Sequence, residues 1–196
     1  MPKPTFSTPA EIIATDEALA SMVLTLRGFD RIAIDTESDG YYRYRPKLCL
    51  IQMSAGGVDY IIDPLAIDNL SPLGLLFGDP NIEKLFHSGP NDLPILRDAA
   101  GSDFVAPYVD TQIAAQVAGL KGIGLGSMTK EFLGVTLDKK YQLHDWGARP
   151  FDPQAIQYAR ADSHYLEALW AIVWPMVLEK GRIAYTRAYS DWPNYK

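Results

Sequence analysis

Two acidic residues follow an apolar run near the start of the chain, in the stretch Ile32-Ala33-Ile34-Asp35-Thr36-Glu37. Such a run is typical of a buried strand, and residues two apart on a strand point to the same face. Asp35 and Glu37 should therefore share one face, while Thr36 points to the other. Neighbouring carboxylates repel each other unless a cation lies between them, and hard oxygen donors suit Mg²⁺ or Mn²⁺. The pair fits either a metal site or a strand that ends in solvated acids.

Further carboxylates in the sequence favour the metal site. Asp92 follows the predicted strand Leu85-Phe86-His87 and opens a predicted helix, where it could bind a ligand or cap the helix. Tyr158 and Asp162 are four residues apart and would share one face of a helix. Four acids thus come from three separate elements. Two-metal phosphoryl transfer needs such a convergence, with the ions about 3.5–4 Å apart around the attacking and leaving oxygens.

The three acidic segments also resemble a known family. Asp35-x-Glu37, Asn91-Asp92 and Tyr158-x-x-x-Asp162 resemble, in order and spacing, the three exonuclease motifs of the DEDD superfamily. The match is to the tyrosine-bearing branch that includes ribonuclease D, because Gln157 stands where the sister branch carries a histidine. The resemblance runs from about residue 31 to residue 169. Within it, the segment 137–150 is also similar to the exosome-associated nuclear exonuclease.

This resemblance implies two divalent cations, Mg²⁺ or Mn²⁺, and a role for each motif residue. Asp35, Glu37 and Asp162 would bind the first metal. Asp35 would bridge to the second metal, where Asp92 would act directly or through water. Tyr158 would orient the attacking water by a hydrogen bond, because a phenol with a pKa of about 10 is a poor base near neutral pH.

The activity that the resemblance implies is 3′→5′ exoribonuclease cleavage, releasing 5′-mononucleotides from RNA 3′ ends in RNA processing or turnover. Two other functions stay open at this stage. One is a 3′→5′ DNA exonuclease of the same fold, and the other is a catalytically silent nucleic-acid-binding module. The presence of all five catalytic positions argues against the silent module.

Two polar segments could hold the substrate. Residues 41–47 alternate aromatic and basic side chains, which can stack on bases and pair with phosphates, although an ordinary exposed hairpin connection would also fit. The second segment begins at Lys139 and leads to the last motif, where the resemblance favours substrate contact or support of the site. For His87, a structural role is the alternative. The residues predicted to bind substrate are Thr36, Tyr41, Arg43, His87, Asn91, Lys140, Gln142, Trp146 and Arg149.

The elements that must position these residues indicate an α/β fold. Strands are predicted over 31–36, 48–54, 59–62, 84–87 and 105–109, with Gly56-Gly57 joining the second and third as a hairpin. Helices are predicted over 16–27, 73–77, 92–100, 111–118, 125–133, 153–161 and 162–180. Hairpins followed by strand–helix units predict a mixed five-stranded sheet flanked by helices. The resemblance implies that this is a ribonuclease H-like fold.

The length predicts a single domain, and the resemblance implies that residues 1–196 form an exonuclease domain. Only sixteen residues follow Lys180, too few for the helical accessory domains of ribonuclease D, so a homodimer or an accessory RNA-binding partner could assist substrate capture. The net charge of −6 argues against coating nucleic acid by bulk electrostatics. The single Cys49 and the lack of a signal peptide or long apolar span predict a cytoplasmic protein that does not bind membranes.

Overall fold

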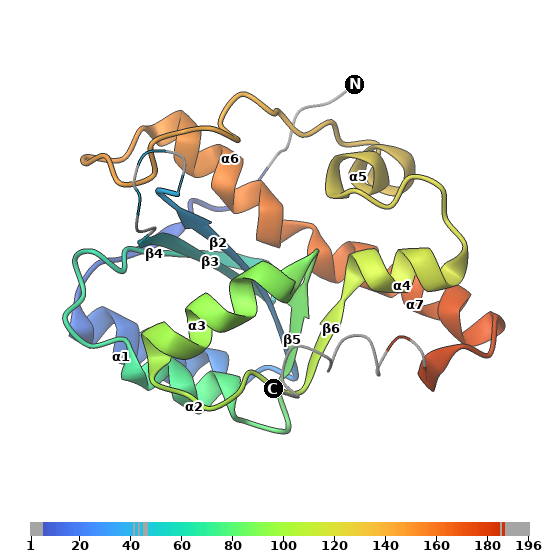
Figure 1. Ribbon diagram of the computed structural model, residues 1–196, viewed down its shortest axis with the longest axis horizontal. Helices are drawn as coiled ribbons and strands as arrows, with labels where there is room; N and C mark the ends of the chain where they lie inside the picture. The colour runs from blue at the N-terminus through green and yellow to red at the C-terminus, as the bar shows by residue number, and fades with distance from the viewer. Residues whose placement is uncertain (1–5, 41, 43, 45–46, 185, 187–196) are drawn as a thin grey trace.

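The computed structural model describes residues 6–40, 42, 44, 47–184 and 186, and its centre is one six-stranded sheet with the strand order β1-β4-β3-β2-β5-β6 (Figure 1). Strands β2, β3 and β4 form an antiparallel meander, while β1, β5 and β6 each run parallel to their neighbour. The strands are β1 (Glu11–Ile13), β2 (Arg31–Ser38), β3 (Leu48–Ala55), β4 (Val58–Ile62), β5 (Glu83–Phe86) and β6 (Tyr108–Asp110).

The predicted α/β fold is confirmed, but the strand count was one too low. The missed strand is β1, which has three residues and is too short for an alternating pattern to be recognised. The predicted fifth strand begins later than expected, at Tyr108, and extends to Asp110. Pro107 precedes it and has no N–H to donate to a sheet ladder. The Gly56-Gly57 hairpin is present, with positive φ values of 57° and 80° that suit glycine.

Helices cover both faces of the sheet. One face of β2, carrying Ile32 and Ile34, packs in a core with α1, α2 and α3, whereas Ala33 on the opposite face packs with α4 and α7. Helix α6 covers β3 and β4 on that second face, through Leu50, Ile61 and Ala159. The helices are α1 (Asp16–Leu26), α2 (Gly74–Phe77), α3 (Asp92–Ala100), α4 (Thr111–Ala118), α5 (Leu125–Leu133), α6 (Pro153–His164) and α7 (Leu166–Glu179).

The junction between the last two helices differs from the prediction. Helix α6 continues to His164, so Asp162 lies inside it rather than at the start of the next helix. The sequence has no glycine or proline between Pro153 and Pro175 and therefore carries no strong local signal for the break at Tyr165. Among the described residues, no helix is long and apolar enough to cross a bilayer.

Candidate active site

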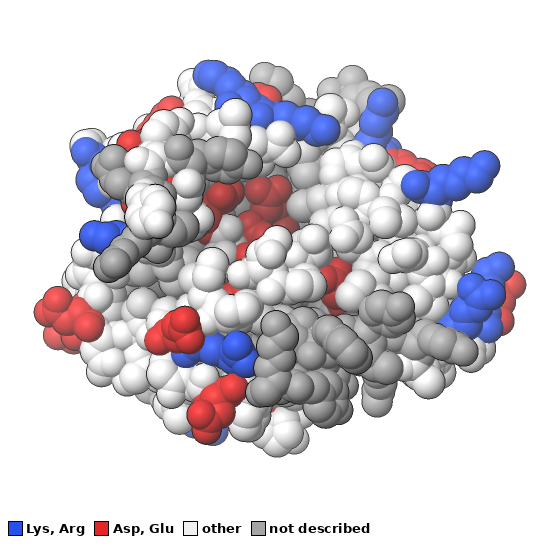
Figure 2. Space-filling model, viewed as in Figure 1, with Lys and Arg blue, Asp and Glu red and all other residues white. Residues whose placement is uncertain are grey.

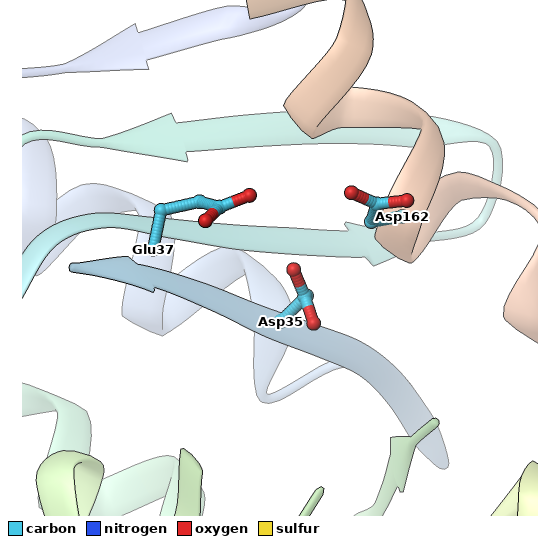
Figure 3. A group of neighbouring side chains, drawn as sticks. All are labelled: Asp35, Glu37 and Asp162. Carbon is cyan, nitrogen blue, oxygen red and sulfur yellow. The ribbon is translucent and has the colours of Figure 1, made fainter. Parts of the chain in front are cut away.

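Three of the predicted metal ligands converge on one point. Asp35 and Glu37 project from the same face of β2, and Asp162 projects toward them from α6 (Figure 3). One carboxylate oxygen from each residue lies within 4.8 Å of the other two. The strand alternation that brings Asp35 and Glu37 together is the one expected from the sequence. The third ligand depends on how α6 crosses the sheet.

Burial and mutual repulsion disfavour the charged forms of the carboxylates in this site. Burial raises the pKa of Asp35 well above its usual value, and the nearby Asp162, Asp92 and Glu37 raise it further. Burial, with Asp162 and Asp92, raises the pKa of Glu37 to about 8. Burial also raises the pKa of Asp162 to about 7. Buried like charges that disfavour one another are stabilised by a cation, so these residues fit one or two hard divalent ions.

Asp92 approaches the site from the other side of β2. The Thr36 hydroxyl donates a hydrogen bond to Asp92 Oδ1. Because Thr36 points away from Asp35 and Glu37, this bond brings the first residue of α3 against the end of β2. Burial raises the pKa of Asp92 to about 6, and the Thr36 bond partly opposes that rise. Thr36 thus orients an acid, a role that the sequence did not suggest.

Asp110 fixes the turn that leads into Asp92. Its carboxylate caps α4, accepting from the backbone N–H groups of Gln112 and Ile113. It also accepts from the N–H groups of Ser88 at 3.1 Å and Gly89 at 2.9 Å. A side chain at Gly89 would place Cβ only 2.7 Å from Phe86 Cβ, so the turn requires glycine there. Nothing in the sequence near Asp110 predicts that it accepts hydrogen bonds from Ser88 and Gly89.

Tyr158 lies one helical turn before Asp162, and its ring contacts two other aromatic rings. The Trp146 ring stacks on Tyr158 at 6.2 Å between centroids, and the Tyr141 ring lies at 6.0 Å. Burial raises the pKa of Tyr158, and the charges of Asp162, Glu37 and Asp35 raise it further. The phenol is therefore neutral at physiological pH and can donate a hydrogen bond. This agrees with a role in orientation rather than proton abstraction.

Two residues predicted to bind substrate, Trp146 and Arg149, make extensive contacts within the protein. The Arg149 guanidinium bonds both Asp63 carboxylate oxygens, at 2.8 and 2.7 Å, and the Cys49 carbonyl at 2.9 Å. It also lies 3.8 Å from the centroid of the Phe151 ring. Trp146 is only 2% exposed. These contacts favour the alternative of support for the site, because they fasten the loop before α6 to the sheet.

The other predicted substrate residues occupy different settings. Lys140 and Gln142 are exposed, and Gln142 lines cavities beside the acids. Asn91 is exposed at the start of α3 and lines the cavity next to Asp92. His87 Nδ1 lies 2.8 Å from Thr111 Oγ1, as expected for a structural histidine, and burial lowers its pKa. Tyr41 and Arg43 lie outside the described residues, so their predicted roles stay predictions.

Three cavities open around the carboxylates. One of about 260 Å³ lies between Glu37, Asp92 and Trp146. Two others, of about 330 and 500 Å³, are both lined by Tyr158 and Asp162 and extend toward the N-terminal segment and toward α5. Figure 2 shows acidic side chains inside a central hollow, with basic side chains around the margin of the same face. The site is therefore open enough to admit a polymer end.

The chain is similar to nucleases in sequence. The 3′-5′ exonuclease domain family matches residues 10–178. Ribonuclease D of Escherichia coli is 42% identical over 157 residues, which cover 80% of this chain and 42% of that protein. The exosome complex component 10 homolog of Caenorhabditis elegans is 35% identical over 185 residues, covering 94% of this chain and 21% of that protein. The chain thus spans less than half the length of these relatives.

Solved structures agree with the sequence matches. The crystal structure of Escherichia coli ribonuclease D, described as an exoribonuclease involved in structured RNA processing, has a TM-score of 0.88 at 36% identity, covering 95% of this chain and 50% of that one. Brucella melitensis NrnC bound to pGG has a TM-score of 0.79 at 27% identity, covering 95% and 91% of the two chains. NrnC has also been solved with bound Mg²⁺, and that structure has a TM-score of 0.75 at 26% identity, covering 94% and 88%. The resemblance to ribonuclease D and the ribonuclease H-like fold are confirmed, and the chain belongs to the 3′-5′ exonuclease family.

Proposed function

We propose that this chain is a divalent-metal-dependent 3′→5′ exoribonuclease that releases 5′-mononucleotides from a free RNA 3′ end. The observation that carries the proposal is the convergence of Asp35, Glu37 and Asp162 oxygens within 4.8 Å, in a chain of the 3′-5′ exonuclease family. Asp92, whose charge raises the pKa of both β2 acids, completes the set of four carboxylates. The Mg²⁺ bound to the similar NrnC supports the choice of metal.

Each residue has a distinct part in the proposal. Asp35, Glu37 and Asp162 would hold one cation, Asp35 would also contact a second, and Asp92 would act at the second. The bound cations would supply the hydroxide nucleophile and stabilise the leaving 3′ oxygen. Neutral Tyr158 would donate its hydrogen bond to the attacking water, while stacked Trp146 keeps the phenol in place. Thr36 would hold the Asp92 carboxylate through its hydroxyl.

RNA is the proposed substrate because several relatives in sequence are named ribonuclease D. Ribonuclease D and an exosome component are the relatives in sequence, and the similar NrnC structure holds pGG. A DNA exonuclease of the same fold is the rival function. Action in the cytoplasm, without membrane binding, stays part of the proposal, as does help from a homodimer or an RNA-binding partner.

The experiment compares 5′-labelled RNA and DNA of one sequence, and a labelled dinucleotide, in Mg²⁺ or Mn²⁺. RNA with a blocked 3′ end tests polarity. We expect single-nucleotide steps from the free 3′ end of RNA, loss of activity in EDTA, and a decrease of about 10²- to 10⁴-fold in Asp35→Asn. Asp98→Asn, an exposed acid on α3, is the matched control and should keep full activity.

The outcomes separate the alternatives. Faster degradation of DNA than of RNA would favour the rival substrate. A fully active Asp35→Asn protein, with wild-type circular dichroism, would refute the metal-site assignment. Binding of RNA by the wild type without hydrolysis in either Mg²⁺ or Mn²⁺ would indicate a silent binding module.

A further inference from the structure

A buried glutamine lies directly beside the metal-binding carboxylates and has no assigned part in the chemistry. Gln52 is on β3, where the antiparallel register places it opposite Asp35 of β2. Its side chain is completely buried, with 0% exposure. Directly opposed residues of an antiparallel pair have Cβ atoms about 4.5–5.5 Å apart on the same face. Gln52 is therefore on the face of the sheet that carries Asp35 and Glu37, beneath α6.

The Gln52 amide is unpaired, which is exceptional for a buried polar group. Neither Nε2 nor Oε1 has a hydrogen-bond partner among the described residues. A buried amide without partners destabilises a fold, so such groups are rare and call for an explanation. The next polar residue on the same face of β3 contrasts with it. Ser54 is also buried, but its hydroxyl donates to Asp59 at 2.7 Å.

Within the sheet, the neighbours of Gln52 point to Asp35 as its polar partner. Leu50 precedes it on the same face, and Ile61 lies opposite it on β4, so both of these sides are apolar. Asp59, beyond Ser54, already accepts hydrogen bonds from Ser54, Arg160 and His164. Asp35 is the remaining directly opposed polar side chain. Its carboxylate has acceptor sites left over after binding cations, since each oxygen carries two lone pairs.

We propose that Gln52 is a positioning residue for the metal site, donating its amide N–H to the Asp35 carboxylate when divalent cations are bound. Hydrogen bonds from a second layer of residues fix the orientation of metal ligands and raise metal affinity. Asp35 is the ligand expected to contact both ions, so its orientation affects both. This inference rests on the proposed two-metal function and adds a determinant of metal affinity that none of the exonuclease motifs contains.

The test uses Gln52→Met, which keeps the length and approximate volume of the side chain but removes the amide. Thermal unfolding is measured first on EDTA-treated protein. Because the amide is unpaired there, we expect Gln52→Met to unfold at the same temperature as the wild type or a higher one. A lower unfolding temperature, or failure to fold, would overturn the proposal by showing that the amide stabilises the fold itself.

Thermal unfolding is then followed during titration with Mn²⁺ and with Mg²⁺. We expect Gln52→Met to need about 10- to 100-fold more Mn²⁺ than the wild type for the same rise in unfolding temperature. Ile61→Leu is the matched control, because Ile61 is buried beside Gln52 on the side away from Asp35. It should keep the wild-type response to Mn²⁺.

Two results would separate the inference from the function on which it rests. A wild type whose unfolding temperature does not respond to either cation would refute the proposed metal site. A wild type that responds, together with a Gln52→Met protein that responds at the same Mn²⁺ concentration, would overturn the role of Gln52 alone.

Discussion

At the scale of single residues, the acids of the site are placed where the fold disfavours their charged forms. Asp35, Glu37, Asp92 and Asp162 all have raised pKa values, and burial is the largest cause for each. Burial is also the largest cause of the raised pKa of Tyr158, which keeps a proton on the phenol. The residues that bring the acids together therefore lower the stability of the cation-free protein. Cation binding would return part of that stability.

This arrangement predicts an unusual pH dependence for EDTA-treated protein. Since the folded-state pKa values exceed those of the unfolded chain, the folded protein holds more protons, and its free energy of unfolding falls as pH rises. The fall should continue through the pKa values of Asp92 and Glu37, about 6 and about 8. Urea unfolding at a series of pH values measures it. Asp35→Asn should flatten the slope, whereas stability that rises over this range would contradict the prediction.

At the scale of elements, two basic side chains attach irregular segments to the sheet. Arg149 fastens the loop that carries Trp146 to Asp63, at the end of β4, and to β3. Lys84 of β5 is fully buried, and its ammonium donates to the carbonyls of Asp79, Ile82 and Ala106 at 2.7–2.9 Å. These bonds join the start of β5 to the loops before β5 and β6. The position of His87 and the following turn depends on this strand.

Replacement of Lys84 should destabilise the protein without altering the metal site. Lys84→Met removes the ammonium that donates to three carbonyl oxygens, so we expect the free energy of unfolding to fall by about 1–3 kcal/mol. Arg27→Met is a matched control, because Arg27 is exposed and lies 3.9 Å from Asp79. Exposed ion pairs contribute little, so this change should stay within about 0.5 kcal/mol. Urea denaturation compares the two variants. Equal losses in the free energy of unfolding would show that the buried Lys84 contributes no more to stability than the exposed Arg27.

At the scale of the whole molecule, acidic and basic side chains occupy different parts of the face that carries the site. The chain carries a net charge of −6, yet acidic side chains lie inside the hollow while basic side chains lie at its margin (Figure 2). Lys130 and Lys139 line the cavity of about 500 Å³ that reaches Tyr158 and Asp162. Exposed lysines in this position suit contacts to RNA phosphates.

We expect Lys130→Ala/Lys139→Ala to weaken RNA binding, measured in the Asp35→Asn background so that the RNA stays intact. Loss of each phosphate contact should reduce the slope of log K against log salt concentration by about 0.7. Lys121→Ala/Lys180→Ala is the control, since both lysines are exposed and line none of the three cavities described above. Equal salt dependence of RNA binding in the two double variants would argue against phosphate contacts at Lys130 and Lys139.

The sequence alone determined the features that depend on local pattern. Alternation on β2 put Asp35 and Glu37 on one face, and a glycine follows the last residue of α3, α4 and α5, where each helix was expected to end. The resemblance of the three motifs to the exonuclease family also predicted which acids belong together. The shared strand face and the helix ends follow from periodicity and from helix-ending glycines, which involve residues only a few positions apart.

Only the tertiary structure decided what depends on residues distant in the chain. Strand β1 forms because β4 is there to pair with it, and Arg149 bonds Asp63, which lies 86 residues before it in the chain. The contact of Thr36 with Asp92 and the placement of Gln52 opposite Asp35 arise from chain crossing and strand register. A residue's type does not specify its long-range partner, because that partner is fixed by the packing of the whole chain. The sequence therefore predicted which acids gather at the site, while the fold determined the residues that surround them.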